Sequence, residues 1–253
     1  MAKLILIANW KNYPPSNKEA VKILNSLSKK AQVFKKLATF IAPPLTYLGI
    51  VSERTRRYAN LASQDIFFKT EGTHTGVVMP DILKSFGVRL SIIGHSERRE
   101  LGESSEVVSQ KVLVALRSGM IPLVCVGEKT RDQDGDHLEF LRDEIKASLE
   151  GVRRKEDAKK LVIAYEPIWA IGKKAKDAIN HAELSQTIIF IRKVLTDIFG
   201  RESADKIPIL YGGSVEPANA DELMHAGGVR GFLIGHASLD AKSFISIAES
   251  MLK

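Results

Sequence analysis

Residues 90–126 read LSIIGHSERRELGESSEVVSQKVLVALRSGMIPLVCV, and this stretch decides the fold. It begins with the short apolar run 90–93 and ends with the apolar run 121–126, and a longer amphipathic segment, residues 105–118, lies between them. Short runs rich in β-branched residues are typical of strands in a parallel sheet that is buried on both faces. The stretch therefore predicts one strand–helix–strand unit.

The same alternation continues in both directions along the chain. Strands are predicted at residues 4–8, 38–42, 61–63, 90–93, 121–126, 161–165, 207–211 and 231–234. Helices are predicted at residues 16–31, 105–118, 137–149, 181–199, 217–226 and 241–252. Eight strands in 253 residues give about 32 residues per unit, the usual length of a βα repeat.

Eight such units predict an α/β fold whose sheet closes into a (β/α)8 barrel, because closure removes both exposed sheet edges. The alternative is an open doubly wound sheet, which normally carries a glycine-rich turn after its first strand. Here the first strand is followed by residues 9–12, Asn-Trp-Lys-Asn, which contain no glycine. Because no linker rich in Pro, Gly or Ser divides the chain, residues 1–253 are expected to form a single domain.

The composition is that of a folded soluble protein, with 44% hydrophobic and 26% charged residues. The longest apolar runs fall well short of the roughly 20 residues of a membrane-spanning helix, so no membrane association is expected. The first strand runs into Asn9 without a signal-peptide cleavage site. The single cysteine, Cys125, lies in an apolar run and is expected to be a buried thiol, which favours a cytoplasmic location.

The formal net charge is +7, from 37 Lys and Arg against 30 Asp and Glu, which raises the question of an anionic partner. The cations occur in the short clusters Lys29/Lys30, Lys35/Lys36, Arg54/Arg56/Arg57, Arg153/Arg154/Lys155, Lys159/Lys160 and Lys173/Lys174/Lys176. These clusters are scattered along the sequence, mixed with acids and not interleaved with aromatic residues. We therefore expect solvated helix faces and no nucleic-acid partner.

In a barrel, chemistry gathers at the carboxyl ends of the strands. Polar residues and glycines follow six of the predicted strands, namely Asn9 and Lys11, residues 94–99, 127–128, Glu166, 212–214 and 235–236. Because parallel strands end on one face of a barrel, these side chains are expected to share one mouth.

Three of these residues suit proton transfer or anion binding. Glu166 follows an apolar strand and precedes Pro-Ile-Trp, and a carboxylate in such a dry setting is a stronger base. His95 stands where a helix can begin, and the positive end of a helix keeps an imidazole neutral, so that it can donate a proton and take it back. Lys11 would supply fixed positive charge. Each could instead have a structural role: Glu166 as an ion-pair partner, His95 as a packed histidine and Lys11 as a solvated lysine.

Glycines follow the last two strands, where backbone N–H groups can bind an anion without a Cβ in the way. Gly212, Gly213 and Gly235 occupy these places, with the hydroxyl of Ser214 beside them. The loops after strands seven and eight are the usual phosphate site of barrel enzymes, although plain turns also use glycine. The histidines are scattered and no HExxH motif occurs, so neither a metal nor another cofactor is expected.

Four motifs, in this order, resemble the triosephosphate isomerase family over nearly the whole chain. They are residues 9–11 (NWK), 92–99 (IIGHSERR), 164–172 (AYEPIWAIG) and 211–215 (YGGSV). The resemblance implies a TIM barrel, a homodimer, and an enzyme of glycolysis and gluconeogenesis. Its reaction would be the interconversion of dihydroxyacetone phosphate and glyceraldehyde 3-phosphate through an enediol(ate), and the pairing of a glutamate base with a neutral histidine is known for this family.

Carried onto this chain, the resemblance makes Glu166 the base that moves a proton between the two carbons and His95 the neutral electrophile at the oxygens. Lys11 and Asn9 would stabilise the developing negative charge, with Glu97 as a supporting acid. The resemblance assigns phosphate binding to Gly172, Ser214, Gly235 and His236, and an apolar clamp over the carboxylate to Ile171 and Leu233.

Two departures from the family pattern concern the substrate pocket. The resemblance implies a lid, residues 167–175, that closes over the bound substrate. After Gly172 this chain reads Lys-Lys-Ala-Lys-Asp at residues 173–177, without the glycine that the family has there and with a longer join to the next helix. His236 stands where a second glycine is common after the last strand, and its Cβ restricts that turn.

The third departure lies in residues 72–79, which resemble the loop that reaches into the neighbouring subunit. Val77 and Met79 stand where the family often has an acid and a serine. Thr75 followed by glycine still predicts a homodimer formed through this loop.

Two other functions stay open. A Schiff-base aldolase acting on a phosphorylated substrate would need a nucleophilic lysine, and Lys11 lies just past a strand. An inactive barrel that only binds sugar phosphates would fit the altered lid and His236.

Overall fold

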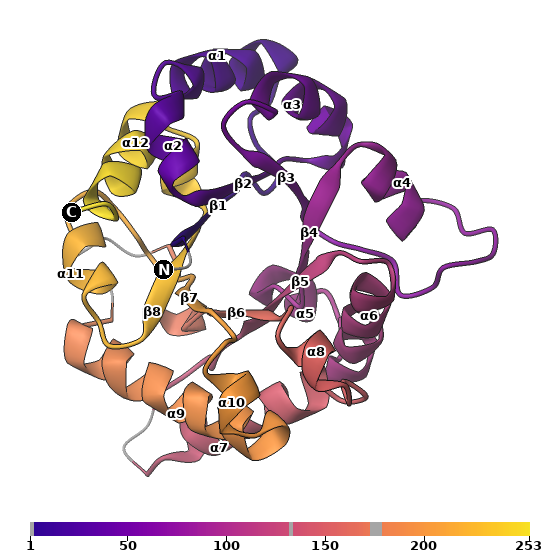
Figure 1. Cartoon of the computed structure of the whole chain (residues 1–253), viewed down its shortest axis with the longest axis vertical. Coiled ribbons are helices and arrows are strands. Elements are labelled where there is room, and N and C mark those ends of the chain that lie inside the picture. Colours follow the sequence, from indigo (N-terminus) through magenta and orange to yellow (C-terminus); the bar gives the residue numbers. More distant parts are fainter. Residues whose placement is uncertain (1–2, 132–133, 173–178) are drawn as a thin grey trace.

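The computed structural model describes residues 3–131, 134–172 and 179–253. Within these residues, eight parallel strands close into a barrel in sequence order, and helices surround it (Figure 1). The strands are β1 (Ile5–Asn9), β2 (Ala38–Ala42), β3 (Asn60–Ser63), β4 (Val88–Ile93), β5 (Ile121–Val126), β6 (Val162–Tyr165), β7 (Ile209–Tyr211) and β8 (Val229–Ile234). The predicted (β/α)8 barrel is confirmed, and every strand boundary lies within two residues of its predicted position.

The helices fill the connections between the strands. They are α1 (Asn17–Ser28), α2 (Ala31–Lys36), α3 (Leu48–Thr55), α4 (Pro80–Ser85), α5 (Ser96–Glu100), α6 (Ser105–Arg117), α7 (Asp136–Ser148), α8 (Lys155–Ala158), α9 (His181–Phe199), α10 (Arg201–Ala204), α11 (Ala220–Met224) and α12 (Ala241–Ser250). Short 3₁₀ turns occur at Leu45–Tyr47, Ile168–Ala170 and His236–Ser238.

Two predicted helices differ from the observed ones. The segment predicted as one helix over residues 16–31 is divided, because Lys30 leaves the helical backbone at φ −112° and ψ 25° before α2 begins. The helix predicted at residues 217–226 is shorter, since only Ala220–Met224 is α-helical. The short helices α2, α3, α4, α8 and α10 are not predicted, because four to eight residues show too little of a helical period.

Several helices begin at a residue whose side chain caps them. Ser16, Ser104, Asn180 and Asp240 each accept a hydrogen bond from the backbone N–H three residues further along. Such a cap satisfies one of the unpaired N–H groups of the first turn and is typically worth about 1 kcal/mol.

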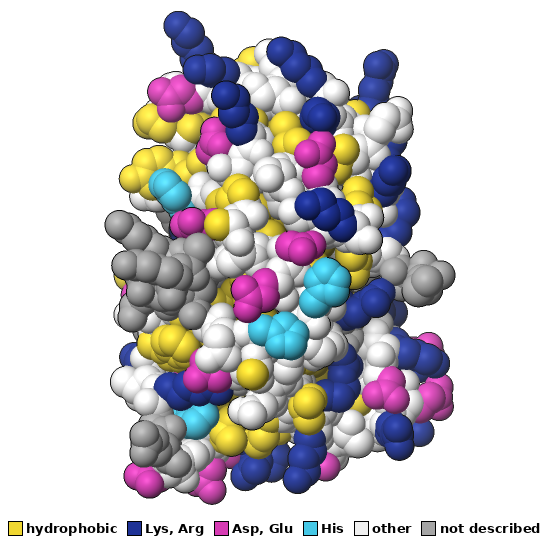
Figure 2. All heavy atoms as spheres, turned by 90° about the vertical axis from the view of Figure 1, so that its left-hand side faces the viewer, with side chains coloured by type: hydrophobic (Ala, Val, Ile, Leu, Met, Phe, Trp, Pro, Cys, Tyr) yellow, Lys and Arg dark blue, Asp and Glu magenta, His cyan; other side chains and the backbone are white. Residues whose placement is uncertain are grey.

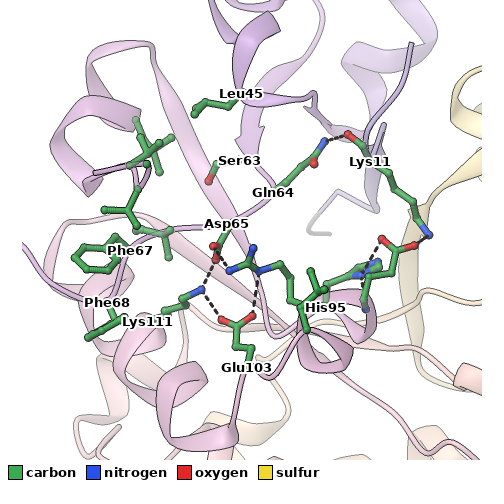
Figure 3. A pocket seen from close by; sticks show the side chains of 18 of the residues that line it. Lys11, Leu45, Ser63, Gln64, Asp65, Phe67, Phe68, His95, Glu103 and Lys111 are labelled. Carbon is green, nitrogen blue, oxygen red and sulfur yellow. Dashed lines mark hydrogen bonds and ion pairs between the residues drawn. The ribbon is translucent and has the colours of Figure 1, made fainter. Parts of the chain in front are cut away.

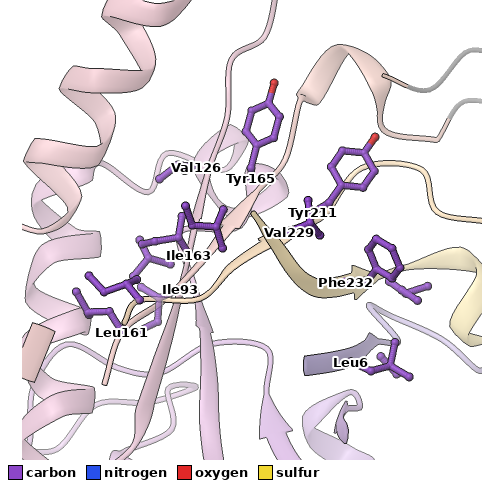
Figure 4. Packing of buried hydrophobic residues seen from close by; sticks show 14 of the residues in the cluster. Leu6, Ile93, Val126, Leu161, Ile163, Tyr165, Tyr211, Val229 and Phe232 are labelled. Carbon is purple, nitrogen blue, oxygen red and sulfur yellow. The ribbon is translucent and has the colours of Figure 1, made fainter. Parts of the chain in front are cut away.

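The strands separate two layers of apolar side chains. Leu123 and Cys125 of β5 point into the barrel, where they pack with residues from all the other strands. Val124 and Val126 alternate with them and pack outward under the helices, in the cluster that Figure 4 shows. Because both faces of the strands are largely covered, most strand residues are apolar. The thiol of Cys125 is buried as predicted.

The barrel closes where β8 pairs with β1. Gly231 lies opposite Ile5 in this register, with φ of 145°, and a Cβ at Gly231 would stand 1.8 Å from the carbonyl oxygen of Ile5. The closing strand therefore needs glycine at this position. In the part of the chain that the structure describes, no helix is long and apolar enough to cross a membrane.

Candidate active site

A cavity of about 420 Å³ opens at the carboxyl ends of the strands. Its lining includes ten of the eleven site residues that the sequence indicates, namely Asn9, Lys11, His95, Glu166, Ile171, Gly172, Ser214, Leu233, Gly235 and His236. The eleventh, Glu97, is not part of this lining, but its Oε1 lies 2.7 Å from Lys11 Nζ. Side chains from β1, β4, β6, β7 and β8 thus meet at one mouth.

His95 is held in one tautomer by the helix that follows it. Its Nδ1 accepts a hydrogen bond of 3.2 Å from the backbone N–H of Glu97, because His95 is the N-cap of α5. A ring nitrogen that accepts has a free lone pair, so this bond favours the tautomer with its proton on Nε2. Nε2 points away from α5 and lies 3.3 Å from Glu166 Oε1.

Glu166 is almost fully buried, with 2% of its surface exposed. Its Oε2 accepts a bond of 3.3 Å from the backbone N–H of Ser96 at the start of α5, and its Oε1 faces His95. Its backbone N–H donates to Val126 at 2.8 Å, which continues the pairing of β5 with β6 beyond the last strand residue. The carboxylate is therefore aimed into the cavity by strands on one side and by a helix start on the other.

Cys125 lies beneath this carboxylate. Burial, followed by the negative charge of Glu166 and a hydrogen bond to it, raises the pKa of the Cys125 thiol well above its usual range. The sulfur thus remains a neutral thiol at neutral pH and adds no second negative charge to the site.

Close packing at the end of β5 requires glycine. A Cβ at Gly127 would stand 1.9 Å from the carbonyl oxygen of Glu166. Any larger residue at Gly127 would displace the backbone that carries the carboxylate.

The backbone of Lys11 is strained. It has φ of 51°, and among the described residues it is the only non-glycine residue with positive φ, a conformation that costs about 1 kcal/mol or more. Its N–H donates to the Asn9 side chain at 3.0 Å, and Gln64 Nε2 donates to its carbonyl oxygen at 2.7 Å. These bonds hold the turn, so that the ammonium group reaches the cavity, where it pairs with Glu97.

A buried ion pair anchors the segments that carry the histidine and the glutamate. Arg99 donates to the carbonyl oxygens of Gly94 at 2.8 Å and Cys125 at 3.3 Å, and its Nε lies 3.4 Å from Glu144 Oε1. Glu144 in turn accepts from the N–H of Gly127 at 2.8 Å. The pair therefore ties the ends of β4 and β5 to α7, although burial raises the pKa of Glu144 while Arg99 opposes that shift.

The far end of the cavity offers backbone N–H groups and a hydroxyl. Ser214 Oγ donates to the carbonyl oxygen of Ala170 at 2.9 Å, and a Cβ at Gly235 would lie 3.8 Å from Lys11 Nζ. His236 begins the 3₁₀ turn after Gly235, and it is exposed at the cavity rim. Its φ is not positive, so the turn accepts a side chain at His236 without strain.

The base of the predicted lid is held by one carboxylate. Glu128 Oε1 accepts 2.8 Å hydrogen bonds from both the Tyr165 hydroxyl and Trp169 Nε1. Burial, and then the charge of Glu128, raises the pKa of Tyr165. The altered lid residues 173–177 lie outside the described residues.

A second cavity, of about 960 Å³, lies beside the first and shares Lys11 and His95 with it (Figure 3). At its other end, Lys111 Nζ lies 2.5 Å from both Asp65 and Glu103. Arg98 lies 2.9 Å from Asp65 and 3.4 Å from Glu103, so two cations and two carboxylates neutralise each other at that end.

Some contacts of the site are not predictable from local sequence. Gln64 lies in the polar run 63–65 at the end of β3, which marks it as a strand-end residue, but the chain gives no sign that its amide reaches Lys11. Glu144 lies within a helix, far from any strand end. Glu128 follows β5 and is visible as a strand-end acid, but its bond to Trp169 depends on the fold. Within the described residues, no group of three or more His, Cys, Asp or Glu side chains could hold a metal ion.

Comparison with known proteins agrees with this geometry. The family model described as Triosephosphate isomerase matches residues 4–251. A triosephosphate isomerase from Fusobacterium nucleatum subsp. nucleatum is 41% identical over 253 residues, covering 99% of each chain. One from Thermoanaerobacter sp. (strain X514) is 40% identical over 255 residues, covering 98% of this chain and 99% of that protein. One from Citrifermentans bemidjiense is 38% identical over 250 residues, covering 98% of each chain. The chain therefore belongs to the triosephosphate isomerase family of enzymes.

Proposed function

We propose that the chain interconverts dihydroxyacetone phosphate and glyceraldehyde 3-phosphate through an enediol(ate), using its own side chains alone. The observation that carries this proposal is the 3.3 Å distance between His95 Nε2 and Glu166 Oε1, two buried groups that line one cavity with Lys11. The relatives named above support the substrate, because their printed name is triosephosphate isomerase.

The proposed reaction moves one proton between neighbouring carbons. The Glu166 carboxylate takes a proton from the carbon beside the carbonyl and returns it to the other carbon. His95 donates its Nε2 proton to the carbonyl oxygen and recovers a proton from the neighbouring hydroxyl. Acid–base catalysis is worth roughly 10² to 10⁴-fold, so the developing oxyanion also needs Lys11 and Asn9, at about 3 kcal/mol per well-placed donor.

The remaining predicted residues would hold and enclose the substrate. Glu97 keeps the Lys11 ammonium in place through their 2.7 Å contact. Ile171 and Leu233, which line the cavity with Glu166, would exclude water from the carboxylate. The phosphate would be bound by Gly172, Ser214, Gly235 and His236, all at the cavity wall.

The decisive variant is Glu166→Gln, which keeps the shape of the side chain but removes the base. We expect kcat in a coupled assay with glyceraldehyde 3-phosphate to fall by at least about 10³-fold, with the circular dichroism spectrum unchanged. Glu222→Gln, an exposed change on α11, is the matched control and should retain full turnover. Normal turnover in Glu166→Gln would end the proposal.

A Schiff-base aldolase is less consistent with the site. Lys11 is bound to Glu97 at 2.7 Å, and an amine engaged as an ion-pair partner is not free to attack a carbonyl. Borohydride should therefore trap no substrate on the chain. An inactive sugar-phosphate binder would instead bind a phosphorylated enediolate mimic without measurable isomerisation.

We also propose that the chain is a single domain and acts as a homodimer in the cytoplasm. The second cavity supports the homodimer, because exposed Leu45, Val77 and Leu101 line it. Exposed apolar side chains grouped in one place are typical of a protein–protein contact. The loop that carries Thr75 joins β3 to α4 and projects from the barrel (Figure 1), so it could enter the same cavity of a second copy.

A further inference from the structure

The charge of the chain is unevenly distributed. Residues 1–57 contain eleven Lys and Arg but only two acids, whereas the remaining 196 residues contain 26 Lys and Arg and 28 acids. The first part of the chain therefore has a formal charge of +9 and the rest has −2. Apart from Lys11, all the cations of residues 1–57 are exposed.

The barrel brings most of these cations to one end. β1, β2 and β3 are neighbours, and each is preceded by cations: Lys3 before β1, residues 35–36 before β2 and residues 56–57 before β3. Lys3 Nζ donates to the Lys35 carbonyl oxygen at 2.6 Å, so the first two groups are in contact. The amino-end patch, as we name it, consists of Lys3, Lys29, Lys30, Lys35, Lys36, Arg54, Arg56 and Arg57.

Most of this patch is not neutralised by acids. Within the described residues, only Lys30 has a carboxylate within 4.0 Å, that of Glu249 at 3.0 Å. On the other side of the barrel, before β6 and β7, Lys159, Lys160 and Lys206 each pair with a carboxylate within 3.0 Å. Both sides carry cations near helix ends, where the helix dipole favours them. In residues 153–160 and 201–206 two of the seven cations, Arg153 and Lys155, have no carboxylate of the described residues within 4.0 Å, against seven of the eight in the amino-end patch.

The helices that carry the patch expose polar side chains. Lys and Arg side chains gather at the upper end of Figure 2, which keeps the vertical direction of Figure 1, where α1 and α3 lie. None of the large hydrophobic side chains exposed in the described part of the chain belongs to α1, α2 or α3. Phe34 and Tyr58 are buried beneath these helices.

The lack of exposed apolar and aromatic side chains on these helices favours one class of anionic partner over the others. Protein interfaces usually depend on apolar or aromatic anchors and are depleted in Lys, and peripheral helices enter membranes through apolar side chains. Single-stranded nucleic acids are held by stacking on exposed aromatic rings. The phosphates of a duplex need only Lys, Arg and small polar donors, which Asn25 and Gln32 supply on the exposed faces of α1 and α2.

We propose that the amino-end patch binds the phosphate backbone of double-stranded nucleic acid without reading its sequence. The sequence predicts no such partner because its cationic clusters lie far apart along the chain, whereas the fold assembles three of them. The patch is at the opposite end of the strands from the candidate active site. The proposal is thus independent of the isomerase function, and duplex binding should leave turnover unchanged.

The test measures binding of the full-length protein to a 20-base-pair DNA duplex and to an RNA duplex of the same length, by fluorescence anisotropy. With about four phosphate contacts, affinity should fall about 100-fold between 50 and 200 mM salt. The variant Lys35→Gln/Lys36→Gln/Arg56→Gln/Arg57→Gln should lose at least about 10-fold in affinity at 50 mM salt and show a shallower salt dependence. Whichever duplex binds more tightly identifies the natural form.

The control removes the same charges from the other side of the barrel, in Lys155→Gln/Lys206→Gln/Arg153→Gln/Arg201→Gln. It should retain affinity within about threefold, although its net charge falls equally. Equal losses in both variants, or no binding by the unaltered protein at 50 mM salt, would overturn the proposal. So would patch-dependent binding to polyglutamate or to phosphatidylserine vesicles without binding to either duplex.

Discussion

At the scale of single residues, the environment of Cys125 predicts a measurable pH dependence of the unfolding free energy. The thiol is 1% exposed and lies beside the Glu166 carboxylate, and burial first and that charge second raise its pKa. An unfolded chain ionises the same thiol near pH 8.5. The pKa of the thiol is higher in the folded protein than in the unfolded chain. Its contribution to the unfolding free energy is therefore fully present below pH 8.5, and it is lost as the pH rises toward the folded pKa, because the unfolded chain ionises first.

We therefore expect the unaltered protein to lose about 1.6 kcal/mol more unfolding free energy than Cys125→Ala between pH 8.5 and pH 10, at up to 1.4 kcal/mol per pH unit. Urea unfolding at fixed protein concentration measures this difference. The buried tyrosines Tyr58, Tyr165 and Tyr211 also have raised pKa values, but they contribute equally to both proteins and cancel. If the unfolding free energies of the two proteins depended on pH in the same way, the raised pKa of the Cys125 thiol would be contradicted.

Residue identity at the strand ends could be predicted from sequence, but the bonding of those residues could not. Glu166 and His95 are visible as polar residues after apolar runs, because parallel strands must end on one face. That Nδ1 of His95 accepts from Glu97 depends on where α5 begins, which a five-residue helix hardly signals. The acceptor role of Nδ1 is thus a property of the folded turn, which the sequence alone does not show.

At the scale of elements, α7 acts on the site without touching the cavity. Glu144 on α7 accepts from the N–H of Gly127 and pairs with Arg99, which bonds to the carbonyl oxygen of Gly94 next to His95. The separation of histidine and glutamate therefore depends on a helix on the outside of the barrel. Sequence patterns fix the position of α7 well, yet they cannot show that one of its acids turns inward.

The change Glu144→Gln keeps an acceptor for Gly127 but leaves the buried Arg99 without its counter-charge. We expect the unfolding free energy to fall by about 1 to 3 kcal/mol. If His95 and Glu166 act as proposed, kcat should fall by at least about 10-fold with KM changed little, because the two side chains move apart. Urea unfolding and steady-state kinetics measure these effects. Glu139→Gln, an exposed change on the same helix, is the control.

A loss of stability in Glu144→Gln with kcat intact would show that the ion pair only supports the fold. Asp restores the charge on a shorter side chain, so Glu144→Asp should recover part of kcat if position and charge both matter. Equal defects in Glu144→Asp and Glu144→Gln would argue against a role for the charge.

At the scale of the whole molecule, the strand ends account for the cavity of about 420 Å³, and a larger cavity of about 960 Å³ lies beside it. Leu101 is 82% exposed and Leu45 is 54% exposed, and both line the larger cavity. Ile82 and Phe86 are also exposed on and next to α4. This grouping of apolar side chains on one side is what a self-association surface requires, and single-chain patterns cannot distinguish it from ordinary surface residues.

If the loop of residues 72–79 fills the larger cavity of a second copy, a bulky charge at its tip must prevent assembly. We expect Thr75→Arg to be monomeric at micromolar concentration by analytical ultracentrifugation, with kcat/KM reduced at least about 10-fold, because Lys11 and His95 line both cavities. Gln32→Arg adds the same charge on exposed α2 and should remain a dimer with full activity. A dimeric Thr75→Arg variant would place the contact elsewhere, and a fully active monomer would separate assembly from catalysis.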